Sequence, residues 1–133
     1  MHATLTIKDE TLYGQSDEAP SFTLDFPRKI VSAREIVETR IRREVEKHNN
    51  AEPAVSRFLI KPNLAEKILN NFKPKEKKPI DWREQYAAAV EAFERNGFIL
   101  LVDDLQIENL NQIIEIEPQT SVTFLKLVTL VGG

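Results

Sequence analysis

Apolar and polar residues alternate in two segments near the start of the chain. Residues 4–8 place Leu5 and Ile7 on one face, and residues 21–27 place three apolar side chains on one face, those of Phe22, Leu24 and Phe26. A period of two is typical of strands with one buried face. Because a polar stretch separates the two segments, the pattern predicts an antiparallel hairpin with a long turn.

A helix is predicted where the period changes after the second strand. Ser32 and Glu35 form a capping box, in which the Ser32 hydroxyl accepts from the Glu35 amide and the Glu35 carboxylate reaches back to the Ser32 amide. We expect this helix to end near His48. Its buried face combines apolar residues three or four positions apart, which are Ile36, Val37, Ile41 and Val45.

A second helix is predicted after the N-cap Asp81. Asn96 and Gly97 are expected to end this helix, because both residue types readily adopt a left-handed backbone conformation. Its inward face is expected to carry Trp82, Tyr86, Ala89, Val90 and Phe93. The segment between the helices is harder to interpret. Residues 57–60 are interpreted as a short strand, and a second capping box predicts a short helix over 63–72. Residues 73–79 form a basic, proline-bracketed connector.

Further strands are predicted towards the end of the chain. Residues 98–102 are apolar on both faces, Asp103 and Asp104 form a turn, and residues 105–107 form a short strand. A final strand is expected over 121–127. The stretch between the last two strands is predicted to be irregular, although it carries the apolar residues Leu110, Ile113, Ile114 and Ile116. The resulting fold class is α+β.

Composition fits one ordinary globular domain. The chain has 133 residues, 41% of them hydrophobic and 29% charged, with a net charge of −3. This charge argues against nucleic acid as the main partner. The absence of cysteine excludes disulfides and thiolate chemistry, and the longest apolar run is five residues. We therefore expect a cytoplasmic monomer with no membrane contact.

Residue patterns of common catalytic sites are absent from the sequence. There is no nucleophile elbow and no phosphate-binding loop among only four glycines. The adjacent acids Asp9–Glu10 and Asp103–Asp104 are expected in solvated turns. His2 and His48 lie far apart, which disfavours a zinc site, and His48 complements the end of the first helix. We predict that the chain is not an enzyme and has neither a metal site nor a bound cofactor.

The final residues carry the candidate chemistry. An apolar strand runs into Gly132 and Gly133, and glycines lack the Cβ atoms that a narrow enzyme groove would exclude. The reactive group would be the Gly133 carboxylate, activated by a partner enzyme that adenylates it with ATP. An enzyme that reads this tail would also contact the uncharged residues Thr129, Leu130 and Val131.

The element order and the Gly-Gly ending resemble the β-grasp fold of ubiquitin-like proteins. The resemblance covers residues 1–48 and 97–133, and Gly132–Gly133 is its specific motif. It implies one domain over 1–133, with a mixed sheet of four to five strands on one helix. A largely helical insertion over 49–97, with a helix at about 82–96, would interrupt the domain, and residues 128–133 would form a flexible tail.

Bacterial ubiquitin-like modifiers are the proteins that this chain resembles in particular. The resemblance implies an isopeptide bond from Gly133 to a target protein, made by an activating and a conjugating enzyme and cut by a JAB-type peptidase. The modifiers it resembles are encoded in bacterial operons together with these enzymes, and for several of these operons the resemblance implies a role in antiviral defence. The tail departs from ubiquitin, which carries arginines where this chain has Thr129, Leu130 and Val131.

Alternatives remain for both the function and the recognition surface. Gly133 would become a thiocarboxylate in a sulfur carrier, and the Gly-Gly would be incidental in a plain binding module or in a fragment of a longer protein. We expect the insertion helix to cover part of the sheet face that ubiquitin leaves open. An apolar patch of Leu101, Leu125 and Leu127 would then be either exposed for recognition or buried beneath that helix.

Overall fold

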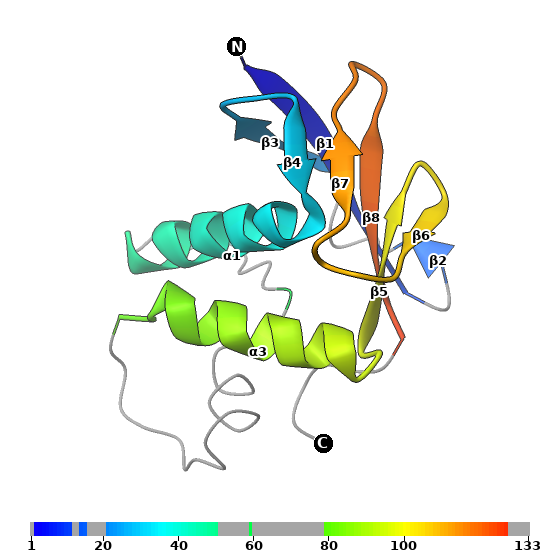
Figure 1. The fold of residues 1–133 in the computed structure, drawn as a ribbon. Helices are drawn as coiled ribbons and strands as arrows, with labels where there is room; N and C mark the ends of the chain where they lie inside the picture. Colours follow the sequence, from blue (N-terminus) through cyan, green and yellow to red (C-terminus); the bar gives the residue numbers. More distant parts are fainter. Residues whose placement is uncertain (1, 12–13, 16–20, 51–58, 60–78, 128–133) are drawn as a thin grey trace.

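The computed structural model describes residues 2–11, 14–15, 21–50, 59 and 79–127. Figure 1 shows the elements in chain order, which are β1 (Ala3–Thr11), β2 (Gly14–Gln15), β3 (Phe22–Phe26), β4 (Ile30–Ser32), α1 (Ala33–Asn49), α3 (Trp82–Glu94), β5 (Phe98–Val102), β6 (Leu105–Ile107), β7 (Ile113–Glu115) and β8 (Ser121–Lys126). The described residues form a mixed sheet, a small second sheet and two helices, so the α+β class is confirmed. The expected short strand at 57–60, helix at 63–72 and connector at 73–79 lie largely outside the described residues.

The main sheet has β1 and β8 side by side at its centre. Its strand order is β2-β1-β8-β5-β6, and β3 pairs with the edge of β1 that does not face β8. β1 and β8 run parallel, with Ile7 opposite Val122, and the remaining pairs in this sheet are antiparallel. The predicted hairpin is confirmed, since Leu5 of β1 lies opposite Leu24 of β3.

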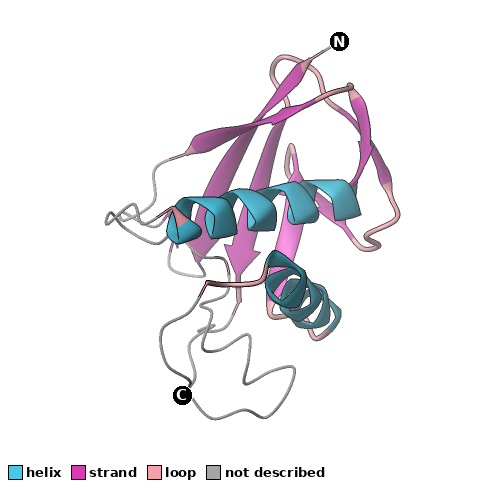
Figure 2. Ribbon diagram, turned by 90° about the vertical axis from the view of Figure 1, so that its left-hand side faces the viewer, coloured by secondary structure: helices cyan, strands magenta, loops and turns pink. Residues whose placement is uncertain are grey.

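Both described helices lie on one face of this sheet (Figures 1 and 2). α1 crosses the sheet, and α3 lies beside α1 near the start of β5. The space between the layers is filled by one apolar core to which β1, β5, β8 and both helices contribute. Its fully buried side chains include Leu5, Ile7, Ile36, Ile41, Leu100, Val122 and Phe124.

α1 begins and ends close to the expected residues. The Ser32 hydroxyl accepts a hydrogen bond from the Glu35 amide at 3.2 Å, which is the first of the two bonds of the predicted capping box. The expected return bond from the Ser32 amide to the Glu35 carboxylate is not found among the described residues. The Glu35 carboxylate accepts from Arg28, with both oxygens within 2.8 Å of Nη2. The predicted apolar stripe is buried, and Lys47 and His48 occupy the last turn, where positive charge complements the helix dipole.

α3 was correctly expected after Asp81, whose carboxylate accepts from the Arg83 amide at 2.9 Å, but its buried face differs from the expected one. Small residues face the core, and the larger apolar residues are only partly buried at its margin. The buried residues are Gln85, Ala88, Ala89 and Ala92, and the marginal ones are Trp82, Tyr86, Val90 and Phe93. Alanines let the backbone of α3 approach α1 closely, which leaves no room for a buried aromatic face.

The position of α3 also corrects the expectation that it covers the open face of the sheet. Its contacts are with α1 and β5, on the face that α1 already occupies. Ala88 and Ala89 are buried in the same core as the inward residues of α1. The helix therefore widens the existing helical layer and does not add a new layer.

A small second sheet was missed by the sequence pattern. Residues 113–115 form β7, which pairs antiparallel with β4, and Val31 lies opposite Ile114. Both strands have three residues, too few to show an alternation, and the exposed Ile113 beside the buried Ile114 obscured the pattern. β2 has two residues and was missed for the same reason.

The predicted turn between β5 and β6 is confirmed, with a left-handed backbone at both acids. Asp103 has φ 48° and Asp104 has φ 74°, which suits a tight two-residue hairpin. The Asp103 carboxylate accepts from the Ser121 amide at 3.0 Å, and this bond ties the turn to the start of β8. Asn96 likewise has φ 61° after α3, as the left-handed stop requires.

Neither described helix combines the length and the apolar character needed to span a membrane.

Candidate functional site

The last described residues show how the chain is held just before the candidate tail. β8 is a central strand that ends at Lys126, and the Leu127 amide then donates to the Gly97 carbonyl at 3.1 Å. Pairing on both sides of β8 holds this departure point. The sequence-predicted site residues Thr129, Leu130, Val131, Gly132 and Gly133 lie outside the described residues.

A buried charge network joins β1 to α1 on the core face of the sheet. The Arg40 guanidinium is fully buried and donates to both oxygens of Asp9, with Nη2 to Oδ2 at 2.8 Å. Its Nε donates to Glu44 Oε2 at 3.1 Å. The guanidinium carbon also lies 4.5 Å from the ring centre of Phe124 and 5.4 Å from that of Phe22.

This network corrects the placement of Asp9 and Glu10 in a turn, because both residues belong to β1 and Asp9 is buried. The sequence contains a signal that was not used. Asp9 continues the inward alternation of Leu5 and Ile7, and Arg40 falls on the apolar stripe of α1. A charged residue at a core-facing position requires a buried partner of opposite charge.

Glu44 connects the network to residue 59 of the insertion. The Leu59 amide donates to both Glu44 carboxylate oxygens, at 3.1 and 3.2 Å, and the Leu59 side chain is buried in the core. The Glu44 side chain is only 10% exposed. This point of the insertion is therefore held by a buried hydrogen bond and by apolar packing.

Burial raises the pKa of Glu44 above its ordinary value, and the adjacent Arg40 offsets only part of this effect. Two carboxylates share one guanidinium, so one negative charge is uncompensated. A carboxyl whose pKa is raised by folding favours the protonated form. Glu44 therefore stabilises the fold fully below its ordinary pKa of 4.5, and this contribution is lost as pH rises through the raised value.

Replacing Glu44 by glutamine tests this assignment. Glutamine keeps an oxygen that can accept from the Leu59 amide but cannot ionise. The stability of Glu44→Gln minus that of the wild type should increase as pH rises above 4.5, measured by urea unfolding at each pH. The comparison cancels the titration of the other carboxylates, which both proteins share. A difference that stays constant or falls with rising pH would contradict a raised pKa.

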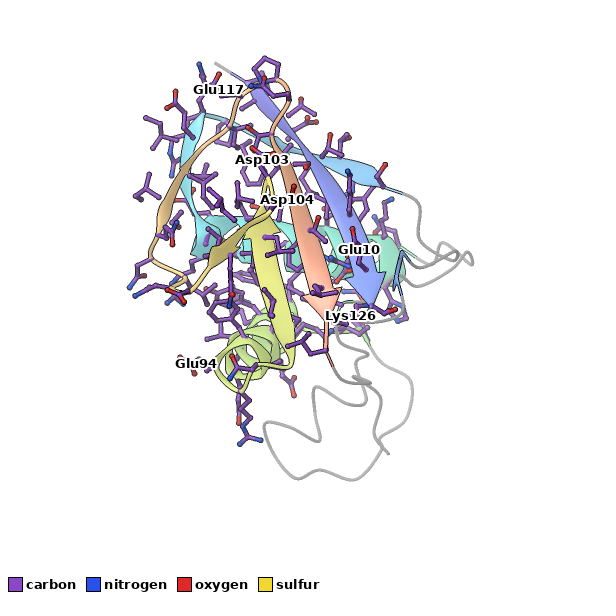
Figure 3. The ribbon with its side chains drawn as sticks, turned by 90° about the vertical axis from the view of Figure 1, so that its right-hand side faces the viewer. Glu10, Glu94, Asp103, Asp104, Glu117 and Lys126 are labelled. Carbon is purple, nitrogen blue, oxygen red and sulfur yellow. The ribbon has the colours of Figure 1, made fainter. Side chains whose placement is uncertain are left out.

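Figure 3 shows the outer face of the sheet, which is turned away from α1. Leu101 and Leu125 of the expected recognition patch lie on this face, because they alternate with the buried Leu100 and Phe124. Leu125 lies opposite Ile99, Leu101 lies opposite Thr123, and all four are partly exposed. Leu127, also partly exposed, follows the end of β8. Because α3 packs on the other face, these leucines are not buried beneath it.

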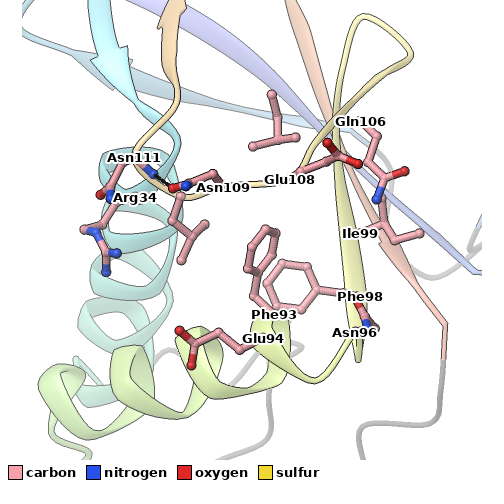
Figure 4. Close-up of a pocket in the computed structure, with 12 residues that line it drawn as sticks. Arg34, Phe93, Glu94, Asn96, Phe98, Ile99, Gln106, Glu108, Asn109 and Asn111 are labelled. Carbon is pink, nitrogen blue, oxygen red and sulfur yellow. Dashed lines mark hydrogen bonds between the residues drawn. The ribbon is translucent and has the colours of Figure 1, made fainter.

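A polar cleft of about 510 Å³ lies between the start of α1, the end of α3 and the segment after β6 (Figure 4). The rings of Phe93 and Phe98, with centres 5.8 Å apart, contribute to its lining. Its polar groups are mostly exposed carboxamides and the carboxylates of Glu94 and Glu108. Among the described residues, no group of three or more His, Cys, Asp or Glu side chains is arranged so that it could hold a metal ion.

Comparisons with protein-family models, with curated proteins and with solved structures give no significant match for this chain.

Proposed function

We propose that this chain is a ubiquitin-like protein modifier, joined to a target through the Gly133 carboxylate. The observation that supports the proposal best is the course of β8. This strand is parallel to β1 at the centre of a mixed sheet that packs on α1, and it leads into the residues before Gly132–Gly133. Such a sheet is compatible with a β-grasp domain, in which the last strand delivers the tail.

The chemistry requires a partner enzyme, because a free carboxylate does not react with an amine unaided. The Gly133 carboxylate would attack the α-phosphorus of ATP, and pyrophosphate would leave as an acyl adenylate forms. A thiol of an activating or conjugating enzyme would then displace AMP, and a target amine would displace that thiol. A JAB-type peptidase would hydrolyse the final bond, and the bacterial proteins of this kind suggest a role in antiviral defence.

The folded part of the chain would supply a fixed support for this reaction. The Leu127 amide is hydrogen-bonded to the Gly97 carbonyl, and β8, which ends just before Leu127, is paired with β1 on one side and β5 on the other. A segment of the length of 128–133 would span at most about 22 Å when fully extended, given about 3.3–3.6 Å per residue. A partner enzyme would have to bind within this distance, and it would need an apolar groove for Leu130 and Val131.

Removing Gly132 and Gly133 should abolish conjugation and leave the fold unchanged. The tagged chain and the truncated variant would be recovered from the host, digested with trypsin and analysed by mass spectrometry. Cleavage after Lys126 leaves the remnant 127–133 on modified residues of the target. Equal urea unfolding midpoints of the two proteins would serve as the control for folding.

The same spectra distinguish the modifier from a sulfur carrier. In a sulfur carrier, one sulfur replaces one oxygen at Gly133 and no branched peptide is found. Branched peptides that persist in the truncated variant would contradict conjugation through Gly133. An unmodified Gly133 in every condition would refute the modifier proposal and leave a binding module.

A further inference from the structure

The outward side of the junction between α1 and α3 presents aromatic and cationic groups together. We call it the α1–α3 seam and define it by Arg34, Arg42, Trp82, Arg83 and Tyr86. The guanidinium carbons of Arg42 and Arg83 lie 4.5 and 5.1 Å from the Trp82 ring centre. The Tyr86 ring centre lies 6.4 Å from that of Trp82. Two arginines from different helices therefore converge on one indole.

Fixed contacts between the two helices hold this arrangement. Arg34 Nη1 donates to the Tyr86 hydroxyl at 3.1 Å, near the start of α1. At the other end, the Asn49 side chain exchanges two 2.9 Å hydrogen bonds with the backbone of Ile80, just before α3. The seam is thus organised before any partner binds, which lowers the entropic cost of binding.

The charges of the two converging arginines are only weakly neutralised within the chain. Arg42 lies 3.6 Å from Glu38 and Arg83 lies 3.8 Å from Asp81, and the arginine side chains are 57% and 75% exposed. Exposed ion pairs at such distances contribute little to stability. A stacked guanidinium also keeps its N–H edge free to bind a carboxylate through two hydrogen bonds.

We propose that the α1–α3 seam binds an acidic segment of a partner protein, with carboxylates beside an apolar side chain. Trp, Tyr and Arg are the residues that most often dominate binding energy in protein interfaces, and Trp82 and Tyr86 are both partly exposed. The arginines complement carboxylates, and the indole complements the apolar side chain. This inference does not depend on the chemistry of Gly133.

A protein segment fits the seam better than a nucleic acid does. Glu38 and Asp81 lie at the margins of the seam, and the chain carries a net charge of −3. A strand with a phosphate at every nucleotide would place negative charge against these carboxylates. A peptide spaces its carboxylates with neutral residues, so only the arginines need to be engaged.

The single tryptophan of the chain makes the seam directly observable, since Trp82 is the only indole. The full chain would be titrated with a synthetic peptide of four glutamates and two leucines, which contains no aromatic residue. Tryptophan emission should change to saturation, and isothermal titration calorimetry should give the same dissociation constant. Binding should weaken as salt is raised, because the contacts are ionic.

Variants then locate the binding. The double variant Arg42→Gln and Arg83→Gln should bind the peptide about tenfold more weakly or worse by calorimetry. Arg95→Gln is the matched control, because Arg95 directly follows α3, is 74% exposed and is paired with Glu91. It should bind like the wild type. Unfolding midpoints would verify that all three proteins fold alike.

Four results would overturn the proposal. The first is no saturable response to the acidic peptide, and the second is equal binding by the double variant. The third is tighter binding of a thymidine oligonucleotide than of the peptide, which would assign the seam to single-stranded nucleic acid. A peptide with lysines in place of the glutamates should not bind, and comparable binding of it would equally exclude recognition of carboxylates.

Discussion

Replacing Arg40 by alanine is expected to lower the free energy of unfolding by about 3–5 kcal/mol. The substitution removes the buried guanidinium that Asp9 and Glu44 share, so two carboxylates lose their charged partner in the core. It also leaves a cavity beside the ring of Phe124. Urea unfolding at pH 7, followed by far-UV circular dichroism, measures the change.

Arg43→Ala is the matched control for this prediction, because Arg43 lies on the same helix and is exposed. Its effect should stay within about 0.5 kcal/mol. If Arg40→Ala were equally mild, the charge network would not be a stabilising part of the core. A large loss confined to Arg40→Ala would show that the cost arises from the buried site of Arg40, through the unpaired acids and the cavity together.

Replacing Phe124 by alanine should have an effect of similar size, a loss of about 3–5 kcal/mol. Phe124 is fully buried on the central strand β8, and its ring centre lies 5.8 Å from that of Phe98. The Arg40 guanidinium lies over the same ring, so the substitution also removes a cation–π contact in a desolvated site. Unfolding in urea, monitored by Trp82 emission and by circular dichroism, measures the loss.

Leu105→Ala provides the control, since the Leu105 side chain is 74% exposed at the start of β6. It should change stability by less than about 0.5 kcal/mol. Because Phe124 and Arg40 are in contact, their substitutions should not be additive, and a double-mutant cycle should give a coupling energy of about 0.5–3 kcal/mol. Simple additivity would show that the ring and the guanidinium act independently.

Both predictions bear on the proposed function through β8. The strand that carries Phe124 ends next to Leu127, the last described residue before the tail, so loss of its packing would also weaken the hold on Leu127. Phe124→Ala would therefore reduce conjugation by lowering the folded population, whereas loss of Gly133 would abolish conjugation with the fold intact. Comparing the two variants separates the support from the reacting group.

Local patterns in the sequence determined the elements whose residues interact mainly with near neighbours. The alternation around Leu5 and Leu24 predicted the hairpin, because period-two burial is a property of a single strand. The caps Ser32 and Asp81 predicted both described helices, because a cap satisfies amides within three residues. The left-handed turn at Asp103 likewise depends on local backbone conformation.

Tertiary structure alone decided the features that join distant segments. The pairing of β4 with β7 depends on bringing Val31 and Ile114 together, and neither short strand has a pattern of its own. The layer that α3 occupies was decided by the fit of Ala88 and Ala89 in the shared core. The same fit left Trp82 at the surface, where Arg42 reaches it from the other helix.

The sequence by itself singled out the tail, because a Gly-Gly pair is visible without a fold. The buried charge network of Asp9, Arg40 and Glu44 is visible only in the packed structure of β1 against α1. Each of the three residues nevertheless lies at an inward position of its own element. Periodicity shows that a residue faces inwards. Only the packed structure shows which opposite charge it meets there, because that partner comes from a different part of the chain.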